Sequence, residues 1–284
     1  MVLGIDVGGS TTKIVGLKSC GECIGMMQVE AGDQITSAFG AFGKFTSAYK
    51  LSISEIKQIV VTGVGASYLD AGMYNIPTKR VDEFLAIGLG GLRMANLPEA
   101  IIVSVGTGTA LVRATENGIK HIGGSGVGGG TLINLAERFA GAHSFASITN
   151  LAAGGNLAEV DLRLSDISRE KIGNLPPHTT VSNLGKIQDT ATHGDIALGL
   201  VNMIFESIGM MAVFATLNDS VKDVVLIGSL SVIDQAAAVF DTLAKLHPDN
   251  RFHIPNDAIF ATAIGAALSE VVLTSSHDKH MKNI

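Results

Sequence analysis

Two stretches of this sequence repeat the same short pattern: a strand, a turn rich in glycine and hydroxyl side chains, and a second strand. The first stretch, GIDVGGSTTKIVGL, spans residues 4–17, and the second, SVGTGTALVRA, spans residues 104–114. Glycine has no Cβ and tolerates positive φ, so both turns can be sharp. A supersecondary unit that occurs twice predicts two related halves that face one another across a cleft.

Strand and helix patterns alternate along the rest of the chain, which predicts an α/β protein. Further strands are expected at residues 22–30, 56–65 and 222–229, and helices at 38–49, 85–95, 131–141, 196–217 and 231–246. We place a domain boundary at residue 98, between a first domain of residues 1–98 and a second domain of residues 99–284 that ends in a helix. Each domain then carries one of the two glycine-rich turns.

The overall composition limits the classes of partner. The 284 residues are 46% apolar and carry a net charge of -6, which argues against a protein that binds nucleic acid through its phosphate backbone. No stretch approaches the roughly 20 uninterrupted apolar residues of a membrane helix. The start MVLGID lacks the basic flank and cleavage site of a signal peptide. We therefore expect no nucleic acid or membrane partner, and a cytoplasmic location.

The first turn has the residue types that hold phosphate groups, because backbone N–H groups of glycine can approach phosphate oxygens closely and hydroxyls add donors. The candidate donors are Gly8, Gly9, Ser10 and Thr11. Lys13 offers a positive charge that neutralises phosphate. Asp6, at the end of the first strand, is suited to a hydrated Mg²⁺, which usually takes one or two carboxylates and keeps several waters. The alternative is a tight hairpin in which Asp6 only forms the turn.

Thr107 and Thr109 make the second turn another candidate phosphate loop, with hydroxyl donors on a flexible backbone. A plain β-turn is the alternative. Downstream, residues 124–129 read GSGVGG, which formally fits the dinucleotide fingerprint G-x-G-x-x-G. The first βαβ unit and the ribose-binding acid that belong to this fingerprint are missing. A glycine-rich helix start that approaches a nucleotide is the better interpretation.

Two adjacent carboxylates, Asp82 and Glu83, lie between a strand-like stretch and the helix expected at residues 85–95. Adjacent side chains on an extended segment point to opposite sides, so at most one of the two is expected to face the cleft. A carboxylate that accepts the proton of an acceptor hydroxyl is what phosphoryl transfer from ATP requires of its base. For Glu83 the alternative is a solvated acid that caps the helix.

Taken together, GIDVGGSTTK, VDEF, SVGTGTA, HIGGSGVGGGTLINL, VVLIGS and AIFATAIGA resemble the type II pantothenate kinases, which belong to the acetate kinase, sugar kinase, Hsp70 and actin superfamily. The similarity extends from residue 1 to about residue 273. It implies two ribonuclease-H-like domains, as in actin-like ATPases, with a nucleotide cleft between them. It also implies that a homodimer uses ATP and Mg²⁺ to phosphorylate pantothenate to 4'-phosphopantothenate, the first step of coenzyme A synthesis.

The resemblance assigns a role to each candidate residue. Glu83 matches the catalytic glutamate, and Thr107 and Thr109 match the hydroxyl residues beside pantothenate. The first phosphate loop corresponds to Asp6, Gly8, Gly9, Ser10 and Lys13, the stretch that approaches the nucleotide to Gly128, Gly129 and Gly130, and the contact with adenosine to Gly228 and Ser229. Asp6, through Mg²⁺, and Lys13 would then organise the phosphates while Glu83 deprotonates the acceptor hydroxyl.

Two segments depart from the family pattern. His121 stands where the family carries an arginine that contacts the substrate region, and a neutral imidazole does not replace a permanently charged, planar guanidinium. The family's S-F-G segment reads SNLG here, residues 182–185. Either Lys120 or another cation takes the arginine's part, or the substrate binds more weakly, or it differs from pantothenate.

Two other functions stay open from the sequence. One is a different small-molecule kinase of the same superfamily, such as an N-acetylhexosamine kinase, because its phosphate loops would look alike. The other is a nucleotide-binding sensor or activator ATPase that phosphorylates no metabolite and couples closure of the cleft to a partner.

Overall fold

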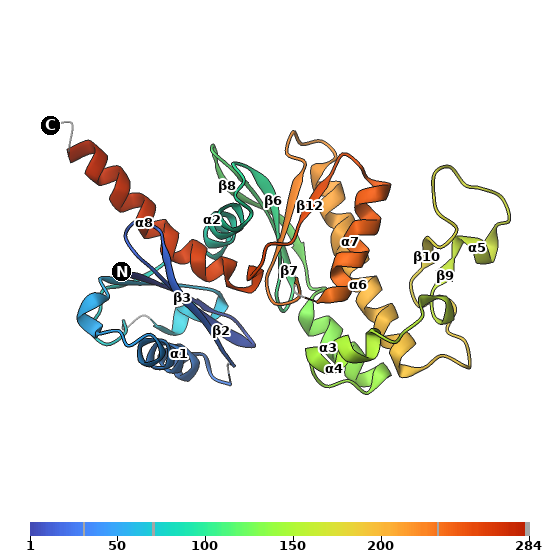
Figure 1. Ribbon diagram of the computed structural model, residues 1–284, viewed down its shortest axis with the longest axis horizontal. Coiled ribbons are helices and arrows are strands. Elements are labelled where there is room, and N and C mark those ends of the chain that lie inside the picture. The colour runs from blue at the N-terminus through green and yellow to red at the C-terminus, as the bar shows by residue number, and fades with distance from the viewer. Residues whose placement is uncertain (31, 70–71, 232, 282–284) are drawn as a thin grey trace.

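The computed structural model describes residues 1–30, 32–69, 72–231 and 233–281. Figure 1 shows two lobes side by side along the long axis of the molecule, each containing one sheet, and an arm that extends beyond the second lobe. Both sheets have five strands. The α/β class predicted from the sequence is confirmed.

The two sheets have the same strand order, which accounts for the repeat in the sequence. In the first sheet, β1 (Val2–Val7), β2 (Thr11–Leu17) and β3 (Cys23–Glu30) form an antiparallel meander, and β4 (Gln58–Thr62) and β5 (Thr78–Arg80) extend it in parallel beyond β1. In the second, β6 (Ala100–Val105), β7 (Thr109–Thr115) and β8 (Gly118–Ser125) form the meander, and β11 (Asp223–Ile227) and β12 (Arg251–His253) are the parallel strands.

Helices cover the outer face of each sheet. On the first sheet, α1 (Gln34–Ala48) packs Phe42 and Phe45 against the β-strand residues of one core. This helix begins earlier than the expected residue 38, because the Asp33 carboxylate accepts a hydrogen bond from the N–H of Thr36 at 2.9 Å and so caps it. On the second sheet lie α3 (Gly129–Ala140), α4 (Phe145–Ala152), α6 (His193–Thr216) and α7 (Asp234–Leu246).

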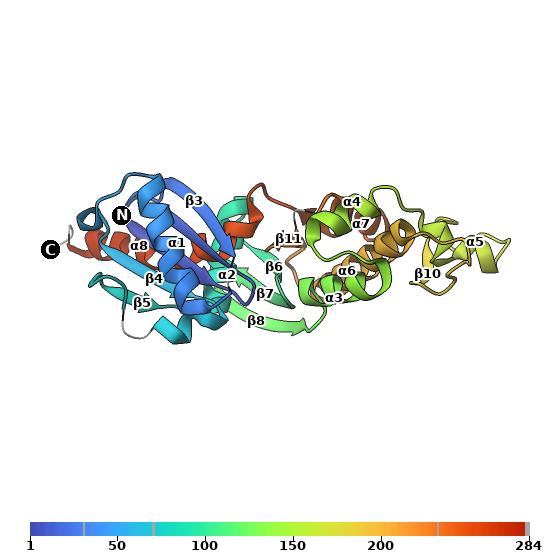
Figure 2. The same cartoon turned by 90° about the horizontal axis from the view of Figure 1, so that it is seen from below.

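The remaining elements are short. The 3₁₀ helices are η1 (Ile53–Glu55), η2 (Val64–Leu69), η3 (Leu157–Glu159) and η4 (Ala258–Phe260). The arm consists of β9 (Leu162–Arg163), α5 (Leu164–Ile167) and β10 (Thr180–Ser182), and Figures 1 and 2 both place it at the end of the second lobe that is farther from the first.

The long helix α6 is apolar enough, by length and composition, to cross a membrane. Its apolar residues instead pack inside the second lobe, where Leu200, Ile204, Phe205 and Ile208 are fully or almost fully buried in one core with β6 and β11. An apolar helix that is hydrophobic over most of its circumference is expected at the centre of a large domain. The buried helix predicted at residues 196–217 is therefore confirmed.

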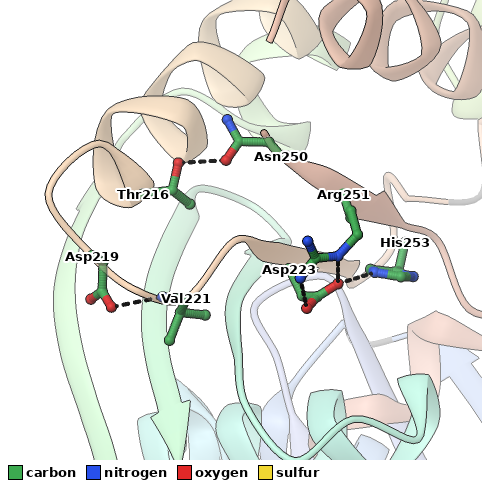
Figure 3. Close-up of polar contacts among 7 residues, drawn as sticks. All are labelled: Thr216, Asp219, Val221, Asp223, Asn250, Arg251 and His253. Atoms are coloured by element: carbon green, nitrogen blue, oxygen red, sulfur yellow. Dashed lines mark hydrogen bonds and ion pairs between the residues drawn. The ribbon is translucent and has the colours of Figure 1, made fainter. Parts of the chain in front are cut away.

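Polar contacts fix the end of the second sheet where β11 and β12 begin (Figure 3). Asp223 accepts two hydrogen bonds from Arg251, at 2.8 and 2.6 Å, and lies 2.7 Å from Nε2 of His253. Nearby, Arg113 of β7 donates to the Asp219 carboxylate, and these hydrogen bonds lower the pKa of Asp219 to about 2. These ion pairs lie at the opposite end of β11 from the turn that follows it.

Two helices cross between the lobes. The helix α2 (Glu83–Ala95) follows the last strand of the first sheet, yet its Ile87 packs with Ile102 and Val112 of the second sheet. The helix α8 (Ala261–Met281) follows the second sheet, yet it packs against Val15 and Val60 of the first. A domain boundary at residue 98 stays a prediction: it separates the strands of the two sheets, but each half contributes one helix to the other.

Glycines allow α2 and α8 to approach closely. A Cβ built on Gly90 of α2 would lie 1.8 Å from the carbonyl oxygen of Ala261, and one built on Gly265 of α8 would lie 1.8 Å from the carbonyl oxygen of Ala86. Neither distance is compatible with a side chain. The two helices therefore touch backbone to backbone, and this contact joins the lobes.

We expect Gly265→Ala to lower the free energy of unfolding by about 1–3 kcal/mol, because the added methyl group forces the two helices apart. Gly43→Ala in α1 is the matched control, since a Cβ there meets nothing within 4 Å. That change should be neutral or stabilising by about 0.5–1 kcal/mol, from the lower backbone entropy of the unfolded state. Urea unfolding of both variants tests this. Equal stability of the two variants would contradict the proposed importance of the close crossing.

Candidate functional site

The two glycine-rich turns predicted to hold phosphate face one another. Gly8–Ser10 connects β1 with β2, and Gly106–Gly108 connects β6 with β7. A Cβ built on Gly9 would lie 3.7 Å from the hydroxyl oxygen of Thr107. Gly9, Ser10 and Thr107 are exposed. The turns of the two lobes thus meet with their polar groups accessible, which is the arrangement needed to hold a chain of phosphates from two sides.

Asp6 and Lys13 lie opposite each other on β1 and β2, just before and after the first turn. Both are buried, and Nζ of Lys13 lies 3.9 Å from Oδ2 of Asp6. Burial raises the pKa of Asp6 and the charge of Lys13 opposes that rise. Asp6 lies two residues from Gly4, where a Cβ would touch Ala263 of α8, so Asp6 is on the face of the sheet that α8 covers.

Asp6 fits the limited demand of Mg²⁺ for protein ligands. A Cβ built on Gly63, after β4, would lie 2.6 Å from Oδ1 of Asp6, so the glycine leaves room beside that oxygen. Within the described part of the chain no cluster of three His, Cys, Asp or Glu side chains could enclose a metal. A magnesium ion that keeps its waters and arrives with phosphate needs only one or two carboxylates. The donor set therefore suits a Mg²⁺ that keeps most of its waters.

Glu83 occupies the first turn of α2 and lies near Asp6. Burial, followed by the charges of Asp6 and Asp82, raises the pKa of Glu83, and Lys13 lowers it. The helix cap is Asp82, whose Oδ1 accepts a hydrogen bond from the N–H of Leu85 at 2.9 Å. The alternative role of Glu83 as a capping acid is therefore wrong. A half-buried carboxylate that has a raised pKa and does not cap the helix is suited to accept a proton.

His121, at the position of the family's arginine, stacks on Phe84, the residue after Glu83. The ring centroids are 4.0 Å apart and the planes are 15° apart. Ile119, two residues earlier on β8, packs with α2 as well, so this face of the strand is turned toward α2. Lys120 lies between them and points to the opposite face. Lys120 is thus not placed to act for the missing arginine. Phe84 is the last residue of the VDEF motif, but no pattern in the sequence indicates that it stacks on His121.

Gly128, Gly129 and Gly130 form the start of α3 and pack on the second turn. The N–H groups of Gly129 and Gly130 donate to the carbonyls of Gly106 and Thr107 at 2.8 and 2.9 Å. A Cβ on Gly128 would lie 2.8 Å from the backbone of Thr107 and Gly108. These glycines are needed for close packing of the helix start on the turn. Their contact with a nucleotide stays a prediction.

Thr109 and Gly228 hold the second turn from both sides. The Thr109 hydroxyl donates to the carbonyl of Val127 at 2.8 Å and is buried, whereas Thr107 is exposed. Gly228, with φ of 95°, follows β11, and a Cβ built on it would lie 2.6 Å from the carbonyl oxygen of Val105. Gly228 and the half-buried Ser229 therefore lie beside the second turn. Ser182 ends β10 in the arm, which lies away from α2 in Figures 1 and 2, and Leu184 packs against the core of the second lobe.

A cavity of about 450 Å³ adjoins Glu83. Its lining residues are Gly63, Val64, Ser67, Arg80, Val81, Asp82 and Glu83. They follow the carboxyl ends of the parallel strands β4 and β5, where α/β sheets commonly bind ligands. Gly63, Ser67 and Arg80 were not among the residues predicted from the sequence, although the glycine that ends the strand IVVTG was an available signal.

Comparisons of sequence show which proteins this chain resembles. The Fumble family model matches residues 94–247. A type II pantothenate kinase of Staphylococcus aureus (strain USA300) is 25% identical over 95% of this chain and 100% of its own length. Pantothenate kinase 1 of Oryza sativa is 34% identical over 128 residues, which are 42% of this chain and 19% of the rice protein.

Solved structures of similar fold include an activator of the 2-hydroxyisocaproyl-CoA dehydratase of Clostridium difficile with bound ADPNP, with a TM-score of 0.69, 16% identity and coverage of 100% of this chain and 98% of that one. A ROK family glucokinase of Streptomyces griseus in complex with glucose and AMPPNP has a TM-score of 0.57 and 12% identity, covering 94% and 97% of the two chains. The predicted fold of two actin-like ATPase domains is confirmed.

The raised pKa of Glu83 has a consequence for stability. A carboxyl whose folded-state pKa lies above its unfolded value favours folding at low pH, and this contribution is lost as the pH rises through the folded-state pKa. Glu83→Gln should therefore raise the free energy of unfolding near pH 7.5 by about 0.5–2 kcal/mol, the usual size of such gains. The difference from the wild type should shrink toward pH 4.

Urea unfolding at the two pH values measures this difference. Glu22→Gln is the control, because Glu22 is exposed in a hairpin, where its carboxylate pairs with Lys18 at 2.9 Å. Exposed ion pairs contribute little, so this change should affect stability little at either pH. A Glu83→Gln protein that is less stable than the wild type at pH 7.5 would show that the ionised carboxylate is well compensated in the free protein.

Proposed function

The chain belongs to the Fumble family, and on this basis we propose that it transfers the γ-phosphoryl group of ATP to the terminal hydroxyl of pantothenate, the first step of coenzyme A synthesis. The observation that carries the proposal is the position of Glu83: a carboxylate with a raised pKa, close to Asp6 and bordering a cavity large enough for a small acceptor. The two polar turns nearby provide for the phosphates of the nucleotide.

In the proposed reaction, Glu83 orients the acceptor hydroxyl and takes its proton. The hydroxyl oxygen forms a bond with the γ-phosphorus while the bond between that phosphorus and the β–γ bridging oxygen breaks, and ADP leaves. Such transition states need positioning and charge neutralisation more than covalent help from the protein. The raised pKa brings Glu83 closer to the operating pH, where proton transfer to it is most effective.

Lys13 and the first turn would bind the phosphates of the nucleotide. Asp6 would hold a Mg²⁺ that comes with the nucleotide and neutralises charge on its phosphates. We assign Gly8, Gly9, Ser10 and Thr11 to the phosphates, Gly128–Gly130, Gly228 and Ser229 to the nucleotide, and Thr107, Thr109 and His121 to the acceptor side. His121 would serve through the aromatic surface that it forms with Phe84.

We also propose a cytoplasmic homodimer. The family resemblance implies that residues 182–185 contact the far end of the acceptor, but β10, which ends at Ser182, lies in the arm of its own chain, away from α2. A second copy of the chain could bring its arm to that site. The net charge of -6 argues against a nucleic-acid partner, whose phosphate backbone is itself negative.

The first experiment measures ADP release by the purified protein with MgATP, with and without pantothenate, and identifies the product by mass. The wild type should release ADP in response to pantothenate and form a monophosphate. Glu83→Gln should lower kcat by about 10²–10⁴-fold, the usual contribution of a general base, and keep ATP binding.

Glu22→Gln serves as the isosteric control and should retain wild-type turnover. Full activity of Glu83→Gln would exclude Glu83 as the base. No stimulation of the wild type by pantothenate, with ATP binding intact, would contradict the acceptor. Stimulation by N-acetylhexosamines would then indicate a sugar kinase, and hydrolysis that ignores small alcohols would indicate an activator ATPase.

A further inference from the structure

The cavity beside Glu83 has acidic surroundings. Asp82 and Glu83 both line it, and Asp6 is close enough to raise the pKa of Glu83. An acceptor that carries its own negative charge would be repelled there unless a cation is present. Of the described residues that line the cavity, Arg80 is the one with a basic side chain.

The position of Arg80 follows from the strand that carries it. Lys79, its neighbour on β5, forms an ion pair with Glu270 of α8 and therefore points to the face covered by α8. Arg80 points to the other face, toward the side of η2, where Val64 and Ser67 complete the cavity wall. In the sheet Arg80 lies beside Val61, which is buried in the core with α1.

We propose that Arg80 is a specificity-determining residue of this kinase, and that its guanidinium binds the carboxylate at the end of the acceptor opposite the reacting hydroxyl. This inference rests on the proposed function. A guanidinium presents a planar fork that matches a carboxylate with two parallel hydrogen bonds. It has five N–H donors, so a bound carboxylate does not require the loss of a partner that Arg80 already has.

The spacing between Arg80 and Glu83 fits an acceptor that has a hydroxyl at one end and a carboxylate at the other. Three residues of extended chain span up to roughly 10 Å, comparable to the length of extended pantothenate. Gly63, Val64 and Ser67 line the same cavity as Arg80 and Glu83. The acceptor hydroxyl would lie at Glu83 and its carboxylate at Arg80. Arg80 would thus supply the charge that His121 and Lys120 do not bring to the site.

The test compares two acceptors that differ in this charge: pantothenate, and pantothenol, its neutral alcohol. For Arg80→Gln, KM for pantothenate should rise about 10- to 100-fold, the effect of one lost charged hydrogen-bonded pair, while kcat changes little. Its kcat/KM for pantothenol should stay within about threefold of the wild type, because that contact is absent for the neutral acceptor. Arg80→Lys, which keeps the charge and loses the fork, should give a smaller rise in KM for pantothenate.

Lys79→Gln is the matched control, because it removes the same charge from the adjacent residue on the opposite face of the sheet. It should keep the wild-type ratio of kcat/KM for pantothenate to kcat/KM for pantothenol. ATP affinity and melting temperature establish that each variant is folded. The inference would be overturned if kcat/KM of the Arg80→Gln and Arg80→Lys proteins fell equally for both acceptors, or for neither. The proposed kinase activity would still stand. If the Arg80→Gln protein does not fold, the Arg80→Lys protein decides by itself. An unchanged ratio of its kcat/KM values for pantothenate and pantothenol would overturn the inference. A wild type that phosphorylates neither acceptor would overturn the proposed function itself.

Discussion

The contact between α2 and α8 at Gly90 and Gly265 is the constraint on which the rest of the arrangement depends. It allows each helix to leave its own half and cover the sheet of the other, so the lobes share structure instead of merely touching. The first turn of α2 carries Glu83, and the same helix packs on the second sheet. The distance between Glu83 and the phosphate turns is therefore set by packing between backbones, which are close to incompressible.

The charges of the site are placed at a cost that the fold offsets locally. Asp6 and Lys13 are buried as a pair, so neither is an isolated charge in an apolar surrounding. Burial, followed by the charges of Asp6 and Asp82, raises the pKa of Glu83. Stability and function are in opposition at this residue, because the same burial that disfavours the ionised form in the free protein makes it a better proton acceptor. The strong ion pairs, such as Arg251 with Asp223, lie at the other end of the second sheet.

Much of the fold could be predicted from the sequence because its signals are local. The repeated strand–turn–strand unit predicted two similar sheets, and the apolar run at residues 196–217 predicted α6. The exchange of α2 and α8 could not be predicted, since the glycines that permit it look like ordinary helix residues until the partner helix is known. At the site, Asp6, Glu83 and the turn residues were found from local patterns. The stacking of His121 on Phe84 joins segments that are distant in the sequence and has no local signal. The cavity at Arg80 had one local signal, the glycine that follows β4.

The distance in sequence between α8 and the first sheet bears on how the protein folds. Ribosomes synthesise the first sheet well before the helix that covers one of its faces, in which Ala263 and Ala267 pack against Val15 and Leu17. Until α8 is made, that apolar face has no covering helix, and the contact that closes it joins residues far apart in the sequence. The first lobe therefore completes its folding only after the second sheet has been synthesised, and until then it exposes apolar surface of the kind that chaperones bind.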